Sequence, residues 1–305
     1  MPIWPPPAER LISVGMVSQP IRNLLKGLID YAGLFPPARL DMALAAAEFE
    51  RQRGGEFGWV VDRFVVPAAR LEELAAARPP GQSIWPLSVL VGAGEPGAER
   101  AAIEKLEKSG RFEVASVEGK PAVPADVGRL AEAFPDRKVY CELPLQGDPS
   151  PWLDALLEFG GRAKIRTGGI VAEAFPKVAE LARFLFAAAA IQLPFKATAG
   201  LHHPLRGEYK LTYEDDSPSA SMHGFLNLFL AAAFLRAGEV DETAVRELLA
   251  EPRAGAFEWT PAGVTWGGLR LSAEAIAEAR KGFSISYGSC SIDEPIADLR
   301  RLHLL

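Results

Sequence analysis

The sequence contains little of what marks several protein classes. Its two cysteines, Cys141 and Cys290, lie far apart and outside any C-x-x-C pair, so neither a disulfide framework nor a cysteine zinc site is indicated. It has no block of lysine and arginine, and its net charge of −6 at pH 7 argues against a nucleic-acid-binding surface, which would be basic and clustered. The longest apolar run of the second half, residues 225–235, is too short to cross a bilayer.

A secretory signal is also not indicated, because the first residues, MPIWPPPAER, contain no basic segment followed by an apolar core. We therefore expect a cytoplasmic protein in a reducing environment, with no nucleic-acid or membrane partner. The composition is that of an ordinary globular chain, with 49% hydrophobic and 24% charged residues among 305. These features leave open whether the chain forms a homo-oligomer.

A β-rich segment followed by a helix-like segment recurs along the middle of the chain. Six such units lie between residues 57 and 200, and a final β-rich segment covers residues 283–291. This alternation predicts an α/β fold with a parallel sheet and crossover helices. Because no Gly-x-Gly-x-x-Gly follows the first strand, we expect a (β/α) barrel of the TIM type rather than a Rossmann sheet.

Two regions depart from this alternation. Residues 1–55 are interpreted as an N-terminal helical extension packed on the barrel, and residues 56–305 as the barrel domain. Within the extension, LIDYAGLFPPA is expected to be an ordered loop that contains the polar pair Asp30 and Tyr31. Residues 256–271 resemble a hairpin with Pro261 and Gly263 in its turn, so the seventh unit is expected to be degenerate. Residues 221–237 are expected to form a helix.

Charged residues occur inside three consecutive expected strands. The side chains that would face the barrel interior, because alternate residues of a strand point to opposite sides, are Glu142, Lys164, Arg166, Lys196 and Thr198. Unpaired charges are costly in a core, so we expect these side chains to form a polar barrel mouth at the carboxyl ends of the strands. Three cations and one anion would leave room for an anionic substrate. The alternative is a structural ion-pair layer in which Glu142 neutralises one lysine.

Lys196 is the candidate nucleophile. With Lys164 and Arg166 as neighbours, its amine would have a lowered pKa and could attack a carbonyl carbon to form a Schiff base. Lys164 and Arg166 would then bind the anion and lower the pKa of Lys196.

The string KATAG around Lys196 resembles the K-x-S/T-x-G motif on strand six of deoxyribose-phosphate aldolase and its class I aldolase relatives. In that family the motif's lysine forms the Schiff base, so the resemblance implies this role for Lys196, with Thr198 and Gly200 at the other two motif positions. The resemblance covers five to seven residues. The family's second lysine lies in a K-x-S-x-G element on the following strand, whereas here the second lysine, Lys164, lies one strand earlier.

Three of the four histidines, His202, His203 and His223, come soon after this motif. His202 and His203 would lie in the loop after the strand and act as general acids or bases, because imidazole titrates near neutral pH. Together with His223 and Glu142 they would supply enough ligands for a divalent metal such as zinc. Their spacing matches no known metal motif, so our primary expectation includes no cofactor and zinc remains the alternative.

An anion seat is expected where Gly168 and Gly169 end one strand and open the next helix, since helix N-termini favour anions. Arg166 and Thr167 would add donors there, and Arg206 is a further candidate for substrate binding. The structural alternative is a tight turn between strand and helix. Cys290 has no activating base near it in sequence and is interpreted as a small packing residue.

Three functions are compatible with these features. The first is a lyase, aldolase-like enzyme acting on a small anionic (carboxylated or phosphorylated) carbonyl compound. The second is a metal-dependent hydrolase that uses the three histidines. The third is a barrel that binds a phosphorylated metabolite without catalysis.

Overall fold

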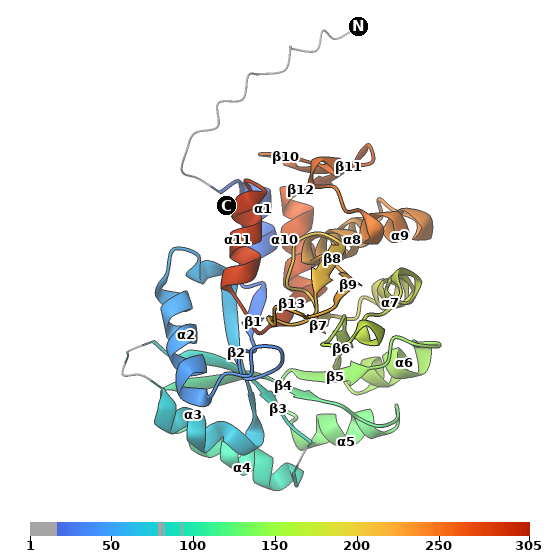
Figure 1. Cartoon of the computed structure of the whole chain (residues 1–305). Coiled ribbons are helices and arrows are strands. Elements are labelled where there is room, and N and C mark those ends of the chain that lie inside the picture. The colour runs from blue at the N-terminus through green and yellow to red at the C-terminus, as the bar shows by residue number, and fades with distance from the viewer. Residues whose placement is uncertain (1–16, 79–80, 82, 93) are drawn as a thin grey trace, which may run out of the picture.

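The computed structural model describes residues 17–78, 81, 83–92 and 94–305. The proline-rich start, where no secretory signal is expected, lies outside these residues. Eight parallel strands close into a barrel surrounded by helices (Figure 1), in the order β1-β13-β7-β6-β5-β4-β3-β2. The barrel strands are β1 (Ile29–Tyr31), β2 (Val61–Pro67), β3 (Trp85–Leu90), β4 (Phe112–Gly119), β5 (Val139–Leu143), β6 (Arg162–Arg166), β7 (Phe195–Thr198) and β13 (Ser284–Ser289). The expected TIM-type (β/α) barrel is confirmed.

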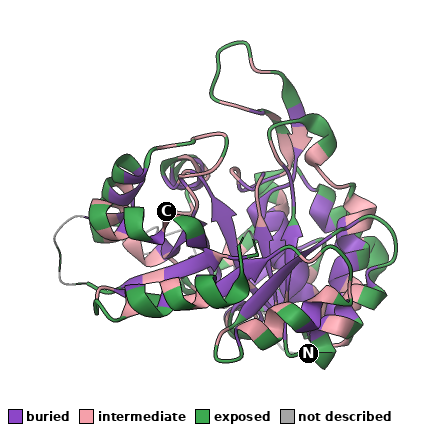
Figure 2. Ribbon diagram, turned by 90° about the horizontal axis from the view of Figure 1, so that it is seen from below, coloured by how far each residue is buried: buried purple, intermediate pink, exposed green. Residues whose placement is uncertain are grey.

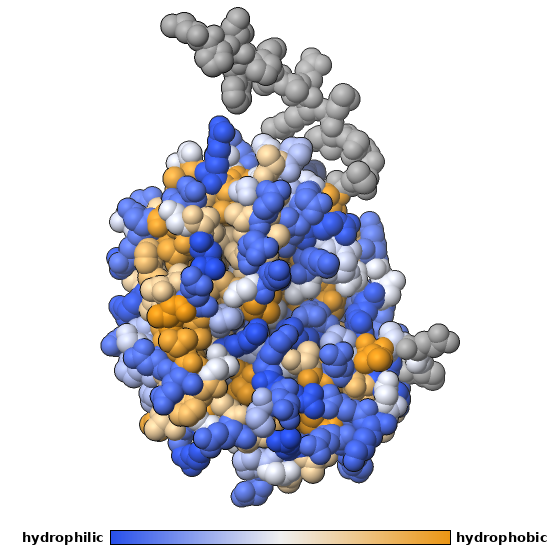
Figure 3. Space-filling model, turned by 180° about the vertical axis from the view of Figure 1, so that it is seen from behind, coloured by the Kyte–Doolittle hydropathy of each residue, from blue (hydrophilic) through white to orange (hydrophobic). Residues whose placement is uncertain are grey.

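Helices follow most barrel strands and pack around them. Their bounds are α1 (Gln19–Leu25), α2 (Met42–Gly54), α3 (Leu71–Ala77), α4 (Pro96–Glu107), α5 (Asp126–Ala133), α6 (Ser150–Glu158), α7 (Val178–Ala190), α8 (Phe225–Ala237), α9 (Glu242–Ala250), α10 (Ala273–Gly282) and α11 (Asp293–Arg301). Figure 2 shows buried strands at the centre and exposed outer faces on the surrounding helices. The face seen in Figure 3 mixes hydrophilic and apolar residues, as ordinary protein surfaces do. No helix in the described part of the chain has the length and hydropathy to span a membrane.

The N-terminal segment contributes a barrel strand, which corrects the helical extension expected for residues 1–55. Strand β1 lies within the segment expected to be a loop, and it pairs with β13 on one side and β2 on the other. It closes the barrel. A strand of three residues is too short to show an alternating pattern, so residue patterns do not predict it.

Because β1 is the first strand of the barrel, each later barrel strand is numbered one higher than expected from the sequence. The strand that contains Lys196 is the seventh of the barrel rather than the sixth, and Lys164 lies on the sixth. The KATAG string therefore does not occupy the position that the aldolase motif has in its own fold.

Two small antiparallel sheets interrupt the connection between β7 and β13. The strands β8 (Gly207–Lys210) and β9 (Ser219–Met222) form a hairpin directly after β7, so the helix expected from residue 221 begins only at Phe225. The expected hairpin at 256–271 has its turn as predicted but gains a third strand. Its strands are β10 (Phe257–Thr260), β11 (Gly263–Trp266) and β12 (Leu269–Ser272).

Candidate functional site

The charged residues of the middle strands lie side by side at one end of the barrel. Glu142 on β5 is in register with Lys164 on β6, which is in register with Lys196 on β7. A cavity of about 260 Å³ opens over these strands. Its lining includes Glu118, Lys164, Arg166, Lys196, Thr198, Gly169, His202 and Cys290. The expected polar mouth at the carboxyl ends of the strands is present.

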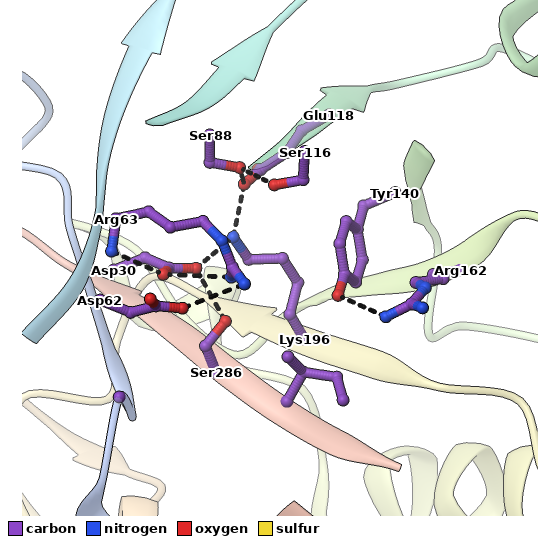
Figure 4. A network of polar contacts seen from close by, with 12 residues as sticks. Asp30, Asp62, Arg63, Ser88, Ser116, Glu118, Tyr140, Arg162, Lys196 and Ser286 are labelled. Carbon is purple, nitrogen blue, oxygen red and sulfur yellow. Dashed lines mark hydrogen bonds and ion pairs between the residues drawn. The ribbon is translucent and has the colours of Figure 1, made fainter. Parts of the chain in front are cut away.

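The amine of Lys196 is held between two carboxylates at the floor of this cavity (Figure 4). Its Nζ lies 2.5 Å from Oδ2 of Asp30 on β1 and 2.5 Å from Oε1 of Glu118 on β4. Only 1% of the Lys196 side chain is exposed. Hydroxyl groups support both carboxylates: Ser286 donates to Asp30 at 2.7 Å and Ser88 donates to Glu118 at 2.5 Å.

The network continues from Glu118 to the rim of the barrel. Lys164 Nζ lies 2.8 Å from Oε2 of Glu118 and 3.3 Å from Oε2 of Glu142. Glu142 in turn accepts from Nε of Arg166 at 3.1 Å. Anionic and cationic groups thus alternate from Asp30 to Arg166. The expectation of three cations facing one anion is wrong, because Asp30 and Glu118 supply carboxylates from strands that lie outside the three considered.

This pairing reverses the expected pKa shift of Lys196. Burial alone would lower the pKa of the amine, but the carboxylates of Asp30 and Glu118 outweigh burial and raise it. The amine is therefore an ammonium ion in the free protein. The lowered pKa expected from two neighbouring cations does not occur, because the carboxylates lie closer.

The pKa values of two carboxylates in the network shift in the opposite direction, downward. Burial opposes ionisation of Glu118, but Lys164 and Lys196 together hold its pKa well below the usual range. Glu142 is also buried, and Lys164 and Arg166 lower its pKa. Both side chains are therefore carboxylates at neutral pH.

Asp30 also contacts an arginine, Arg63. Arg63 on β2 places Nη1 3.4 Å from Oδ1 of Asp30 and Nη2 3.0 Å from Oδ2 of Asp62. Figure 4 shows dashed lines from the Asp30 carboxylate to both Arg63 and the Lys196 amine. Asp30 is thus fixed by two cations and cannot rotate away from Lys196 without leaving Arg63 partly unpaired.

The three histidines do not form one ligand set. His202 Nδ1 lies 2.9 Å from Glu294, and His203 Nδ1 lies 2.6 Å from Asp298. His223 lies apart from them, with Nε2 2.7 Å from the carbonyl oxygen of Pro176. Among the described residues, no group of three or more His, Cys, Asp or Glu side chains is arranged to hold a metal ion. The zinc site considered from the sequence is therefore not assembled.

Two of these histidines also do not titrate near neutral pH. Burial lowers the pKa of His202, but its bonds to Cys290 and Glu294 outweigh burial and raise the pKa to about 10. Burial lowers the pKa of His223 to about 4, with a further contribution from Arg206. His202 is therefore a cation that can donate a proton, whereas His223 is a neutral structural residue.

The helix start expected at Gly168 and Gly169 is wrong, so a helix N-terminus does not contribute to an anion site there. The next α-helix starts at Val178, after a 3₁₀ turn at Ala172–Ala174. Gly168 instead permits a close approach of two loops, since a Cβ at this position would lie 2.8 Å from Cα of Gly200. Thr167 is buried and donates to the carbonyl oxygen of Ala199 at 2.6 Å, which ties the same loops together.

Arg206 is not at the barrel mouth. Its guanidinium donates to Nδ1 of His223 at 3.2 Å, and its backbone N–H donates to Asn227. It is not among the residues that line the cavity. The substrate-binding role expected for Arg206 is therefore not supported.

Sequence reasoning missed two central groups, and for different reasons. Glu118 occupies the end of β4, a position similar to that of Glu142 at the end of β5, so an isolated charge in a β-rich segment was the available signal. Asp30 cannot be placed from the sequence, because its strand is too short to be recognised. Cys290, expected to be a small packing residue, lines the cavity among side chains from distant parts of the sequence.

No protein-family model matches this sequence, and the searches for similar curated proteins and solved structures also returned no match. The function must therefore be argued from the site.

Proposed function

We propose that this chain is a lyase that makes or breaks a bond next to the carbonyl group of a small anionic compound. The observation that carries the proposal is the charge of the cavity lining. The lining contains four cations, Lys164, Arg166, Lys196 and protonated His202, against the carboxylate of Glu118 and the thiol of Cys290. The partners of Lys196 and Arg166, the carboxylates of Asp30 and Glu142, are not part of this lining, so a carboxylate or phosphate group that enters the mouth meets an excess of positive charge.

In this proposal Lys196 acts as an ammonium ion. Breaking a bond next to a carbonyl group leaves an electron pair that spreads onto the carbonyl oxygen. A fixed, buried ammonium group stabilises that developing oxyanion, because preorganised charge in a site shielded from water has a large effect. Arg166, at the rim, and Lys164 would hold the anionic group of the substrate and orient the carbonyl towards Lys196.

A Schiff base on Lys196 is still a testable route within the same proposal. The ammonium would first pass a proton to Glu118 or Asp30, and the neutral amine would add to the carbonyl carbon. The protonated carboxyl could then return the proton to the leaving hydroxyl, which departs as water. The raised pKa of Lys196 works against this route, because the first proton transfer must overcome the stability of the ion pairs.

The test compares Lys196→Met and Lys196→Arg with the wild type on small 2-oxo acids and phosphorylated aldehydes. Lys105→Met, on the exposed surface of α4, is the matched control. We expect Lys196→Met to abolish turnover and the control to leave it unchanged. Activity in Lys196→Arg supports the ammonium role, whereas borohydride trapping of the substrate on Lys196 supports the Schiff base. Turnover by Lys196→Met at the wild-type rate would overturn the proposal.

The complete pairing of the network favours a second candidate, a barrel that binds an anionic metabolite without changing it. Every charged group from Asp30 to Arg166 has a partner in the free protein, which a purely structural or binding role would also require. Calorimetric binding of the same compounds without conversion by the wild type would favour this candidate.

A further inference from the structure

A second group of reactive side chains lines the same cavity on the side of β13. Cys290 follows the end of β13, and its side chain is part of the cavity wall together with His202. Cys290 as a residue is only 6% exposed, so a ligand would reach its thiol only through the cavity. None of the chemistry proposed for Lys196 uses this thiol.

The sulfur of Cys290 has polar neighbours from separate segments of the chain. The hydroxyl of Tyr213 lies 3.6 Å from Sγ, and His202 lines the same cavity wall. A hydroxyl donor and a protonated imidazole near one sulfur atom both stabilise a thiolate.

A carboxylate completes the arrangement. Glu294, at the start of α11, lies 2.9 Å from Nδ1 of His202 and so holds one side of the imidazole ring. Tyr213 also reaches Glu294, at 3.4 Å. Thiol, imidazole and carboxylate in sequence are the parts of an activated cysteine nucleophile, in which the carboxylate orients the imidazole and the imidazole takes the thiol proton.

We propose that Cys290, His202 and Glu294 form a second reactive centre, in which the Cys290 thiolate adds covalently to the carbonyl carbon of small anionic aldehydes. The carbon–sulfur bond forms as the carbonyl π bond breaks, and the proton of His202 passes to the new oxyanion. The product is a neutral hemithioacetal beside a neutral imidazole, so no oxidant or further reactant is needed. The class of ligand rests on the proposed function, whereas the inference that the Cys290 thiol is ionised does not depend on it.

The surrounding charges are consistent with an ionised thiol. Burial opposes ionisation of Cys290, but its bond to protonated His202 outweighs burial and lowers the thiol pKa. The other titratable groups near Cys290 are Tyr213, Glu294 and Tyr31. Burial and nearby negative charge, including that of Cys290, raise the pKa of both tyrosines. The pKa of Glu294 is lowered, because its bond to His202 outweighs burial. Cys141 is the internal contrast, since burial without a partner raises its pKa to about 12.

The first test measures the rate of alkylation of each cysteine in the native protein as a function of pH, with iodoacetamide and peptide mapping. We expect Cys290 at pH 6.5 to react about tenfold faster than an unperturbed thiol, which is mostly protonated at that pH. Cys141 should stay unlabelled. The inflection for Cys290 should move upward in His202→Gln and, to a smaller extent, in Tyr213→Phe, which retains the ring. Failure of Cys290 to react in the native protein, or an inflection near that of a free thiol, would overturn the proposal.

The second test detects the adduct with [2-¹³C]glyoxylate as the probe. We expect a new ¹³C signal of a hemithioacetal carbon with the wild type and its loss in Cys290→Ala. Acetaldehyde, which has no charge, should give a much weaker signal at the same concentration. Absence of the glyoxylate signal would reject the carbonyl addition. Both readouts are independent of turnover, so a failure of the lyase proposal would leave them unchanged.

Discussion

The amine of Lys196 and the carboxylate of Glu118 meet inside the barrel although their strands are not neighbours. Lys196 is on β7 and Glu118 on β4, with β6 and β5 between them, and the atoms lie 2.5 Å apart. The two side chains therefore reach towards each other across the barrel interior. Because both also line the mouth cavity, any ligand bound there would contact an ion pair that exists before binding.

Glu118 is expected to be the most sensitive carboxylate for stability. Glu118→Gln removes the partner shared by Lys164 and Lys196. Each lysine then keeps one other carboxylate, Asp30 or Glu142, but the buried network has one excess positive charge, and breaking a buried pair typically costs ~3–5 kcal/mol. The matched control is Glu113→Gln on the exposed side of the same strand, where we expect a change within about 0.5 kcal/mol. Urea unfolding at pH 7 measures both. Equal stabilities of the two variants would show that the network contributes little.

The contribution of Glu118 should disappear in acid. Its pKa is lowered in the folded protein, so it stabilises the fold above the ordinary glutamate pKa of about 4.3 and this stabilisation is lost as the pH falls through the folded value. The difference in unfolding free energy between wild type and Glu118→Gln should be constant from pH 8 to about 5 and should shrink below about pH 4.3. A pH series of urea unfolding curves provides the measurement. A constant difference down to pH 3 would contradict the ionised network.

His202 and His223 should differ in charge across the whole neutral range. The pKa of His202 is raised to about 10, so its imidazolium stabilises the fold fully below about pH 6.5, and that contribution is lost as the pH rises through about 10. The pKa of His223 is lowered to about 4, so its contribution is present above about pH 6.5 and is lost as the pH falls through about 4.

Nuclear magnetic resonance of histidine labelled with ¹³C in the ring follows both titrations, with His202→Gln and His223→Gln for assignment. Between pH 6 and 9 neither signal should move appreciably. A midpoint for His202 near pH 6.5 would mean that its bonds to Glu294 and Cys290 are absent in solution.

The sequence predicted the barrel and half of the site because both depend on local patterns. Lys164, Lys196 and Glu142 lie within strands long enough to show alternation, and parallel strands bring their carboxyl ends together. Their charge state could not be predicted, because it depends on Asp30 and Glu118, which come from other strands. The role of Cys290 was hidden for the same reason, since His202 is 88 residues away in sequence and Tyr213 is 77.

The variant Arg166→Ala distinguishes between two roles of the barrel mouth, anion binding and a purely structural ion-pair layer. About half of its side chain is exposed (48%), and its partner Glu142 also has Lys164, so Arg166→Ala should cost at most about 1 kcal/mol of stability. A hydrogen bond to a charged ligand contributes ~1.5–3 kcal/mol, so the affinity for phosphate should fall by about tenfold or more. Arg129→Ala, in an exposed pair on α5, is the control and should change neither quantity. Calorimetry with inorganic phosphate and urea unfolding give the two readouts. If Arg166→Ala instead lost stability and kept its phosphate affinity, the cations of the mouth would serve the fold alone.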